Sequence, residues 1–278
     1  TTGSNNVAIG QDALTANTTA SSNVSIGHNS MVANTTGTEN VAVGTNALDA
    51  NTTGQSNVGV GQNALGANTT AYYNTAVGAG SLLVNTTGTR NAALGYAALD
   101  ANTDANDNTG LGYQALSANS TGDNNTAVGS YALVTNTTAD NNTAVGYSAL
   151  LYNTTGTDNV AVGAYALDAA TTANGNSAVG YAALGAATTG NYNVAMGYQA
   201  LLTNVDGDRN VAIGASALQT LDPSSNVDMY NVAVGHSAGL ALTTGIKNTF
   251  IGGESGDATT TADANTAVGY GSLGANTT

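Results

Sequence analysis

The residues that could carry out acid–base or metal chemistry are few and widely spaced. The chain has two histidines, His28 and His236, and neither has a carboxylate at a fixed spacing from it. Serine and threonine are plentiful, but none is accompanied by a base and by a residue that would orient that base, as nucleophilic catalysis requires. The pattern argues against an enzyme, and it calls for no cofactor.

Two short segments alternate oxygen-bearing side chains in the manner of a calcium-binding loop. The first segment has Ala and Leu where an EF-hand loop has its turn Gly and its terminal Glu. We therefore favour solvated turns for both segments and keep calcium binding as the alternative. The candidate ligands are Asp100, Asn102, Asp104, Asn106, Asp206 and Asp208.

A recurring Asn-x-Ser/Thr sequence offers acceptors for N-linked glycans in a secreted protein. The same Asn-Thr-Thr run could instead be a turn in which side chains stack from one repeat to the next, and we favour that interpretation. The candidate asparagines are Asn17, Asn34, Asn51, Asn68, Asn85, Asn119, Asn136 and Asn153.

Composition excludes several classes of partner. Seventeen acidic residues against three basic ones give a net charge of −14. Binding to nucleic acid depends on Lys and Arg, so a nucleic-acid partner is not expected. No apolar run reaches the roughly 20 residues of a membrane-spanning helix, so insertion into a membrane is not expected either. Cysteine is absent, which excludes disulfides and thiolate chemistry.

One repeat accounts for the whole sequence. The block Asn-Val-Ala-Ile-Gly begins at Asn6, and equivalent blocks follow every 17 residues as far as Asn210. One step of 21 residues then reaches Asn231, after which the spacing of 17 resumes. The organisation is a single array over residues 1–278, with regular repeats in 6–209, an insertion near 221–230, divergent repeats in 231–264 and a last repeat in 265–278.

The period predicts an all-β fold, a parallel β-solenoid or β-roll of about 16 coils with 17 residues in each. A single repeat buries too little apolar area to order itself, whereas stacked coils cover one another and share hydrogen bonds. At about 4.8 Å per coil the array would form a rod on the order of 75 Å long. With the Asn of each block as position 1, stacked Asn amides are expected to hydrogen-bond along the rod.

Each remaining position has an expected role. Positions 2–4 predict a short strand, residues 112–116 a helical turn, and residues 17–19 a second extended segment. Position 5 is always Gly, which predicts corners with positive φ or a close approach of the backbone at Gly10, Gly27, Gly44, Gly61, Gly78 and their equivalents. Positions 4 and 9 are expected to face inward and form the core, as at Ile9, Leu14, Val43, Leu48, Val77, Leu82, Val128, Leu133, Val162 and Leu167.

The pattern changes near the C-terminal part of the chain. The insertion contains the only proline, Pro223, and predicts a loop at one edge of the rod. In the following copies Gly239 and Gly256 replace Leu, and Phe250 replaces Ala. We interpret these changes as tolerated variation, with a contact site as the alternative. Neither end shows a capping repeat, so we expect a segment of a longer array or a subunit that joins end to end.

The block Asn-Val-Ala-[Ile/Val]-Gly, as in residues 6–10 and 40–44, resembles the head repeats of YadA-like trimeric autotransporter adhesins. The longer pattern in residues 142–156 resembles repeats of phage tail fibres. The adhesin resemblance implies a left-handed β-roll wound as a trimer and adhesion to host surfaces. The repeat is longer here than in those adhesin heads.

We therefore expect a structural extracellular fibre or filament protein, a rod-like shaft with an adhesive role, at a cell surface or on a virion. The expected partners are other copies of the chain, in an end-to-end polymer or a parallel homotrimer, together with cell-surface or glycan ligands. The alternatives are a phage tail-fibre shaft in host recognition and, because of the repeated Thr pairs, an ice-binding solenoid. One further set of residues predicts an outer ladder or a contact surface between chains: Tyr96, Tyr113, Tyr147, Tyr181 and Tyr198.

Overall fold

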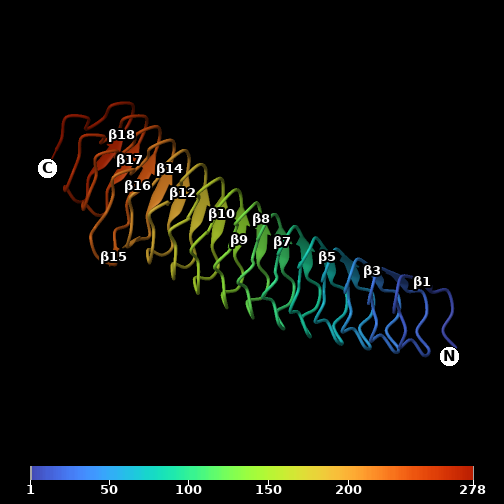
Figure 1. Ribbon diagram of the computed structural model, residues 1–278. Helices are drawn as coiled ribbons and strands as arrows, with labels where there is room; N and C mark the ends of the chain where they lie inside the picture. Colours follow the sequence, from blue (N-terminus) through green and yellow to red (C-terminus); the bar gives the residue numbers. More distant parts are fainter. Residues whose placement is uncertain (1, 278) are drawn as a thin grey trace. The chain divides into compact units, whose positions relative to one another are not determined.

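The computed structural model describes residues 2–277 and shows an all-β parallel β-solenoid (Figure 1). It has about 16 coils, each of about 17 residues, and the described part of the chain contains no helix. The chain divides into two compact units, Thr1–Asp140 and Asn141–Thr278. We call them unit 1 and unit 2 and describe each by itself.

In unit 1, each coil contributes one strand of three residues. Neighbouring strands pair in parallel without slippage, so that Val7 lies opposite Val24 and Ile9 opposite Ile26. The strands are β1 (Val7–Ile9), β2 (Val24–Ile26), β3 (Val41–Val43), β4 (Val58–Val60), β5 (Thr75–Val77), β6 (Ala92–Leu94), β7 (Thr109–Leu111) and β8 (Thr126–Val128).

Unit 2 repeats this arrangement and adds a second pair of strands. Its main strands are β9 (Thr143–Val145), β10 (Val160–Val162), β11 (Ser177–Val179), β12 (Val194–Met196), β14 (Val211–Ile213), β16 (Val232–Val234), β17 (Thr249–Ile251) and β18 (Thr266–Val268). The additional pair joins β13 (Gly207–Asp208), at the end of a 17-residue coil, to β15 (Val227–Asp228) in the 21-residue coil that follows. The inserted residues are thus anchored to the coil before them, and Leu221 and Met229 are fully buried.

The strands face the opposite way from our prediction. The small residue at position 3 points into the core, and Ala42 and Ala161 are both 0% exposed. Side chains alternate along a strand, so positions 2 and 4 point outward, and Ile9 is 59% exposed. The prediction of an inward position 4 is therefore wrong for the residues that we placed in the core: Ile9, Val43, Val77, Val128 and Val162.

The prediction for position 9 is confirmed. This position fills the centre of each coil with one large aliphatic side chain, and the named leucines Leu14, Leu48, Leu82, Leu133 and Leu167 are all buried. The segment that contains this leucine is a series of turns rather than a helix, because residues with φ of about 50–60° alternate along it, as at Gln114 and Leu116. The helical turn predicted at 112–116 is therefore wrong, and residues 17–19 form bends rather than a second strand.

The glycine at position 5 turns the chain at the end of each strand. The predicted positive φ is confirmed, at 130° in Gly10, 135° in Gly27, 138° in Gly44, 137° in Gly61 and 139° in Gly78. A Cβ atom on Gly78 would lie 2.3 Å from the carbonyl oxygen of Gly95. Glycine is required here for its backbone conformation and because the next coil approaches so closely.

Two columns of buried asparagine hold the coils together. At position 1, the Asn40 backbone N–H donates to Asn23 Oδ1 at 2.9 Å, and Asn40 Nδ2 donates to the Gly54 carbonyl at 2.8 Å. At position 12, Asn51 Nδ2 donates to Asn34 Oδ1 at 2.9 Å. The predicted ladder of stacked amides at position 1 is confirmed, and so is the stacking that we favoured for the Asn-Thr-Thr run at position 12.

Candidate interaction surfaces

The two histidines lie on the surface. His28 and His236 are both exposed and occupy position 6 of their coils. Among residues 2–277 no three His, Cys, Asp or Glu side chains come together in a group that could hold a metal ion.

The candidate calcium ligands are largely used for hydrogen bonds between coils. Asn102 is buried, and its Nδ2 donates to Asn85 Oδ1 at 2.7 Å. Asn106 Oδ1 accepts from the Thr89 backbone N–H at 2.9 Å. In the second segment, Asp206 Oδ1 accepts from the Thr189 hydroxyl, and Asp208 Oδ1 accepts from the Asn191 backbone N–H, each at 2.6 Å. Asp104 stays at the surface, whereas Asp100 lines a groove described below.

The candidate glycan acceptors form the second asparagine column. Their amide nitrogen, the atom to which a glycan would be attached, points into the coil; Asn34 Nδ2, for example, donates to the Gly37 carbonyl at 3.0 Å. The glycosylation alternative is thus wrong for the folded coils at Asn34, Asn51, Asn68, Asn85, Asn119, Asn136 and Asn153, all of which are fully buried. Asn17, in the first coil, is half-buried.

The repeated threonines also act within the array. At position 13, the Thr18 hydroxyl donates to the Thr35 carbonyl of the next coil at 3.0 Å, and Thr35 and Thr52 repeat this contact at the same distance. These hydroxyls therefore stabilise the stacking of coils.

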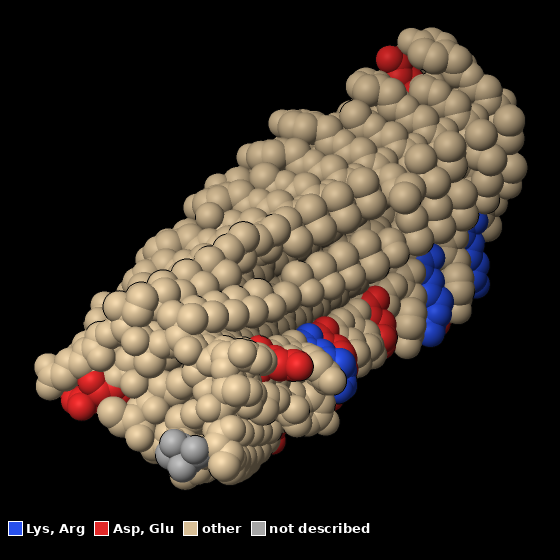
Figure 2. All heavy atoms as spheres, turned by 90° about the vertical axis from the view of Figure 1, so that its right-hand side faces the viewer, with Lys and Arg blue, Asp and Glu red and all other residues tan. Residues whose placement is uncertain are grey.

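The outer face of the sheet carries no charge; its position 4 is aliphatic, whereas its position 2 is Val or Ala in nine strands and Thr or Ser in seven. Position 4 is Val, Ile, Leu or Met in every coil, although it faces outward. Leu94 is 48% exposed and Leu111 is 38% exposed, and they border a shallow hollow of about 190 Å³. Figure 2 shows the charged side chains gathered mainly along one edge of the visible face, beside a broad surface without any. We call the outward residues of positions 2 and 4 the outer sheet face.

Charge is concentrated instead at positions 16 and 17, on the turn before each strand. Arg90 pairs there with Asp107 of the next coil through Nε–Oδ1 at 2.6 Å and Nη2–Oδ2 at 2.7 Å. The guanidinium holds the pKa of Asp107 below its ordinary value. Both side chains are exposed, so the pair contributes little to stability.

Tyrosines form columns on the turn after each strand. In unit 1, the Tyr96 and Tyr113 rings stack with centroids 5.5 Å apart, and Tyr131 meets Tyr113 edge to face at 5.3 Å. In unit 2, Tyr147, Tyr165, Tyr181 and Tyr198 contact one another in order, with centroids 5.4, 5.8 and 5.5 Å apart. The outer ladder, one of our two alternatives for these tyrosines, is present within each unit, whereas a contact surface between chains stays a prediction. The ladder includes Tyr131 and Tyr165 at position 7, which we had not predicted.

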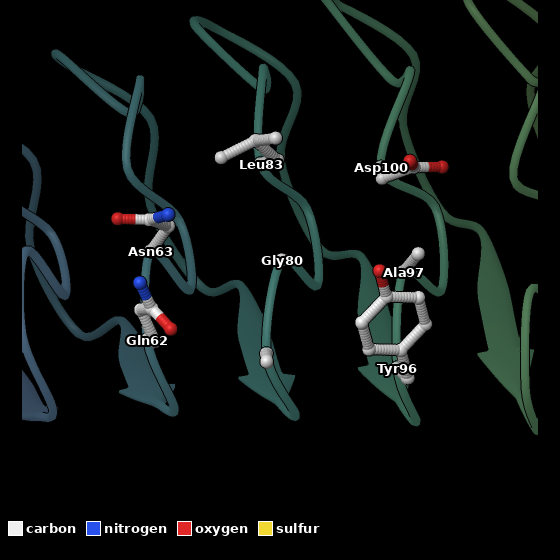
Figure 3. A pocket seen from close by; sticks show the side chains of 8 residues that line it. Gln62, Asn63, Gly80, Leu83, Tyr96, Ala97 and Asp100 are labelled. Atoms are coloured by element: carbon white, nitrogen blue, oxygen red, sulfur yellow. The ribbon is translucent and has the colours of Figure 1, made fainter.

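Grooves lie beside these columns. In unit 1, a groove of about 250 Å³ spans three coils, with Gln62 on the first, Gly80 and Leu83 on the second, and Tyr96 and Asp100 on the third (Figure 3). Burial raises the pKa of the Asp100 carboxyl above its ordinary value. The groove combines an aromatic ring, a carboxylate and an amide.

A second groove, of about 440 Å³, lies in unit 2. Its polar and aromatic residues are Tyr165, Asp168, Tyr181, Gln199 and Thr203. Burial also raises the pKa of Asp168. The sequence contains a sign of this groove at position 10, where Asp168 is followed at steps of 17 residues by Gly185 and Leu202. This order of residues becomes visible only when the same position is compared in successive repeats.

Within residues 2–277 there is no helix long and apolar enough to cross a membrane. Comparison with protein-family models gave no match to the chain. Comparison with curated proteins gave none either.

Proposed function

We propose that the chain is the shaft of an extracellular structural fibre with an adhesive role, in which parallel copies pack through the outer sheet face. The observation that carries this proposal is position 4, which is aliphatic in every coil and yet faces outward. Neighbouring outward positions are not restricted in this way, since position 7 contains Asp12, Asn63, Tyr131 and Glu254.

The type of sheet supports a covering partner. Parallel sheets in proteins are generally covered on both faces, whereas a solvated face carries polar residues. Here the inner face packs on the leucine core, and the outer face presents Leu94, Met196 and Ile213 at exposures of 48, 42 and 38%. A repeated apolar surface of this kind is typical of a contact between proteins.

The repeat favours a second copy of the chain as that partner. Every strand presents the same kind of side chain at the rise of one coil, so a partner with the same rise can contact every coil in the same way. Closed rotational symmetry among identical chains provides this match. Although the chain has a net charge of −14, the main strands contain no charged residue, so packing through them buries none of the acidic side chains.

The stacking of coils supports the role of a stiff shaft. Backbone hydrogen bonds, the asparagine columns and the threonine hydroxyls all connect one coil to the next. Because bending would have to break several of these bonds at once, such an array resists deformation.

The test is the assembly state of the purified chain, measured by analytical ultracentrifugation and by electron microscopy with mass per length. We expect a mass that is a small multiple of 27.1 kDa. The variant Leu94→Asp/Leu111→Asp should be a folded monomer, with an unchanged circular dichroism spectrum. Gln55→Asp/Tyr72→Asp, at the charged turn of two neighbouring coils, adds the same charge elsewhere and should assemble normally. A wild-type monomer at about 100 μM, or a double variant that still assembles, would overturn the proposal.

A further inference from the structure

The groove of unit 2 is built by three successive coils. Tyr165 and Asp168 lie on the first, Tyr181 and Gly185 on the second, and Gln199 and Leu202 on the third. None of the described residues that line it is Lys, Arg or His.

Two tyrosine rings stand almost at right angles beside the groove. The Tyr165 and Tyr181 rings have an interplanar angle of 80° and centroids 5.8 Å apart, and Tyr181 is 47% exposed. The face of an aromatic ring carries negative charge density and attracts cations within about 6 Å of its centroid. Both rings line the groove, so a cation within the groove lies beside them.

A carboxylate lies at the floor of the groove, next to a glycine. A Cβ atom on Gly185 would lie 3.4 Å from Asp168 Oδ1 and 3.3 Å from Leu202 Cδ1. The missing side chain leaves Asp168 accessible between the coils, although it is half-buried. A partly desolvated carboxylate without a basic neighbour favours a cationic ligand, because the ligand restores the interactions lost with water.

The same chain already holds a cation in this way. The Arg209 guanidinium carbon lies 5.4 Å from the centroid of the Tyr192 ring and 5.9 Å from that of the Tyr230 ring, and Arg209 is paired with Asp228. That site combines two tyrosines with one carboxylate, as the groove does, but the groove has no internal cation.

We propose that the groove formed by Tyr165, Asp168 and Tyr181 binds the alkylammonium group of a soluble organic cation. The two rings contact the alkyl groups, and Asp168 pairs with the charge. The inference goes beyond the proposed fibre and is independent of it, since the groove lies on the turn after the strands and not on the outer sheet face.

Unit 1 contains a matched site that lacks the tyrosines. Asp49, Gly66 and Leu83 repeat the Asp–Gly–Leu order at position 10, with a Gly66 Cβ 3.4 Å from Asp49 Oδ1 and 3.7 Å from Leu83 Cδ1. Burial raises the pKa of Asp49 as it does that of Asp168. The residues equivalent to Tyr165 and Tyr181 are Asn46 at position 7 and Gln62 at position 6, and neither provides an aromatic ring.

The experiment is a titration of the full chain with choline, followed by saturation-transfer NMR on the ligand methyl protons. The uncharged compound of the same shape, 3,3-dimethylbutan-1-ol, is the control ligand. We expect saturable binding of choline and at least tenfold weaker binding of the alcohol. Asp168→Asn should weaken choline binding at least fivefold. Gly185→Leu should abolish it by filling the floor with a residue found at position 10 in other coils, such as Leu83 and Leu240.

Two further variants locate the site. Asp49→Asn and Asp100→Asn should leave the affinity for choline unchanged. Asp49 has no ring beside it, and the groove that Asp100 lines has one ring, Tyr96, instead of two. Equal affinity for choline and the alcohol would overturn the proposal. So would unchanged binding by Asp168→Asn, or an equal loss in Asp100→Asn. Because each variant is also checked by ultracentrifugation, a failure of assembly is distinguishable from a failure of binding.

Discussion

The ring of Phe250 occupies the space beside Gly256 that a leucine side chain fills in other coils. A Cβ atom on Gly256 would lie 2.6 Å from Phe250 Cδ1 and Cε1, and one on Gly239 would lie 2.9 Å from Phe250 Cδ2. Phe250 is fully buried. The three departures from the repeat are therefore one compensated exchange, in which one large side chain at position 3 replaces two at position 9. The changes that we interpreted as tolerated variation are thus coupled to one another.

This exchange predicts a rescue. Phe250→Ala should lower the free energy of unfolding by about 3–5 kcal/mol, because it leaves a cavity between two glycines. The triple variant Gly239→Leu/Phe250→Ala/Gly256→Leu restores the ordinary repeat and should recover the stability to within about 1.5 kcal/mol of wild type. Urea unfolding followed by circular dichroism measures both. The control is Ala178→Phe, at position 3 of a coil that retains its leucine, Leu184. This variant should lower the free energy of unfolding, because the core of that coil has no space for a ring. A triple variant no more stable than Phe250→Ala would contradict the compensation.

The corner glycines predict a contrast within one coil. Gly78 has a φ of 139°, and a Cβ atom added to it would lie 2.3 Å from the carbonyl oxygen of Gly95. Gly80 has a φ of 67°, and a Cβ atom added to it would meet no other atom within 4 Å. Gly78→Ala should destabilise by about 3 kcal/mol or more, since it adds a backbone clash to a conformation that only glycine adopts readily. Gly80→Ala should lower stability by about 1 kcal/mol. Thermal melting compares the two variants, and equal losses would rule out the clash as the cause.

The second asparagine column predicts a stabilising substitution. The column is interrupted at Ala187, which is fully buried next to Asn204. In Ala187→Asn, the new Oδ1 would accept from Asn204 Nδ2, and its Nδ2 would donate to the Gly190 carbonyl. We expect a gain of about 1 kcal/mol, the usual net value of a buried hydrogen bond. The measurement is the unfolding midpoint, with Ala186→Asn, one residue outside the column, as the control. A lower midpoint for Ala187→Asn than for the control would contradict the prediction.

Three aspartates at position 10 predict that the stability of the fold depends on pH in an unusual way. Burial raises the pKa of Asp49, Asp100 and Asp168 above the ordinary value of 3.8. The folded state therefore binds these protons more tightly than the unfolded state does, so their contribution to stability is fully present below pH 3.8 and is lost as pH rises through the raised values. Asp107 has the opposite shift but is exposed, and we expect it to contribute little.

The corresponding variant is Asp49→Asn/Asp100→Asn/Asp168→Asn. It should melt at a higher temperature than wild type at pH 7, because it removes three partly buried charges. The difference should shrink as the pH is lowered towards 3.8, where the wild-type carboxyls become neutral as well. Melting curves at pH 7, 5 and 4 give the comparison. A difference that stays constant with pH would show that the charges are not its cause.

Much of the fold could be predicted from the period of the sequence alone. A spacing of 17 residues places identical side chains directly above one another, so Asn23 and Asn40 had to meet once the coils stacked. The glycine of position 5 likewise predicted a corner, because no other residue adopts its backbone conformation readily. These features depend on one residue and its own copies, and repetition reveals them directly.

Which face of each strand points into the core depended on the tertiary structure. Position 4 is aliphatic in every coil and position 3 is usually Ala, so alternation alone does not say which of the two faces is inside. The core decides it: a Cβ atom at position 3 in Gly59 would lie 3.4 Å from Leu48 Cγ, which leaves room for Ala but not for Val or Ile. The grooves depend on the same packing, because they join positions 6, 7 and 10 from different coils. The sequence by itself thus determined the repeat and its ladders, whereas the tertiary structure decided which side chains the narrow core could accept and which were left on the surface.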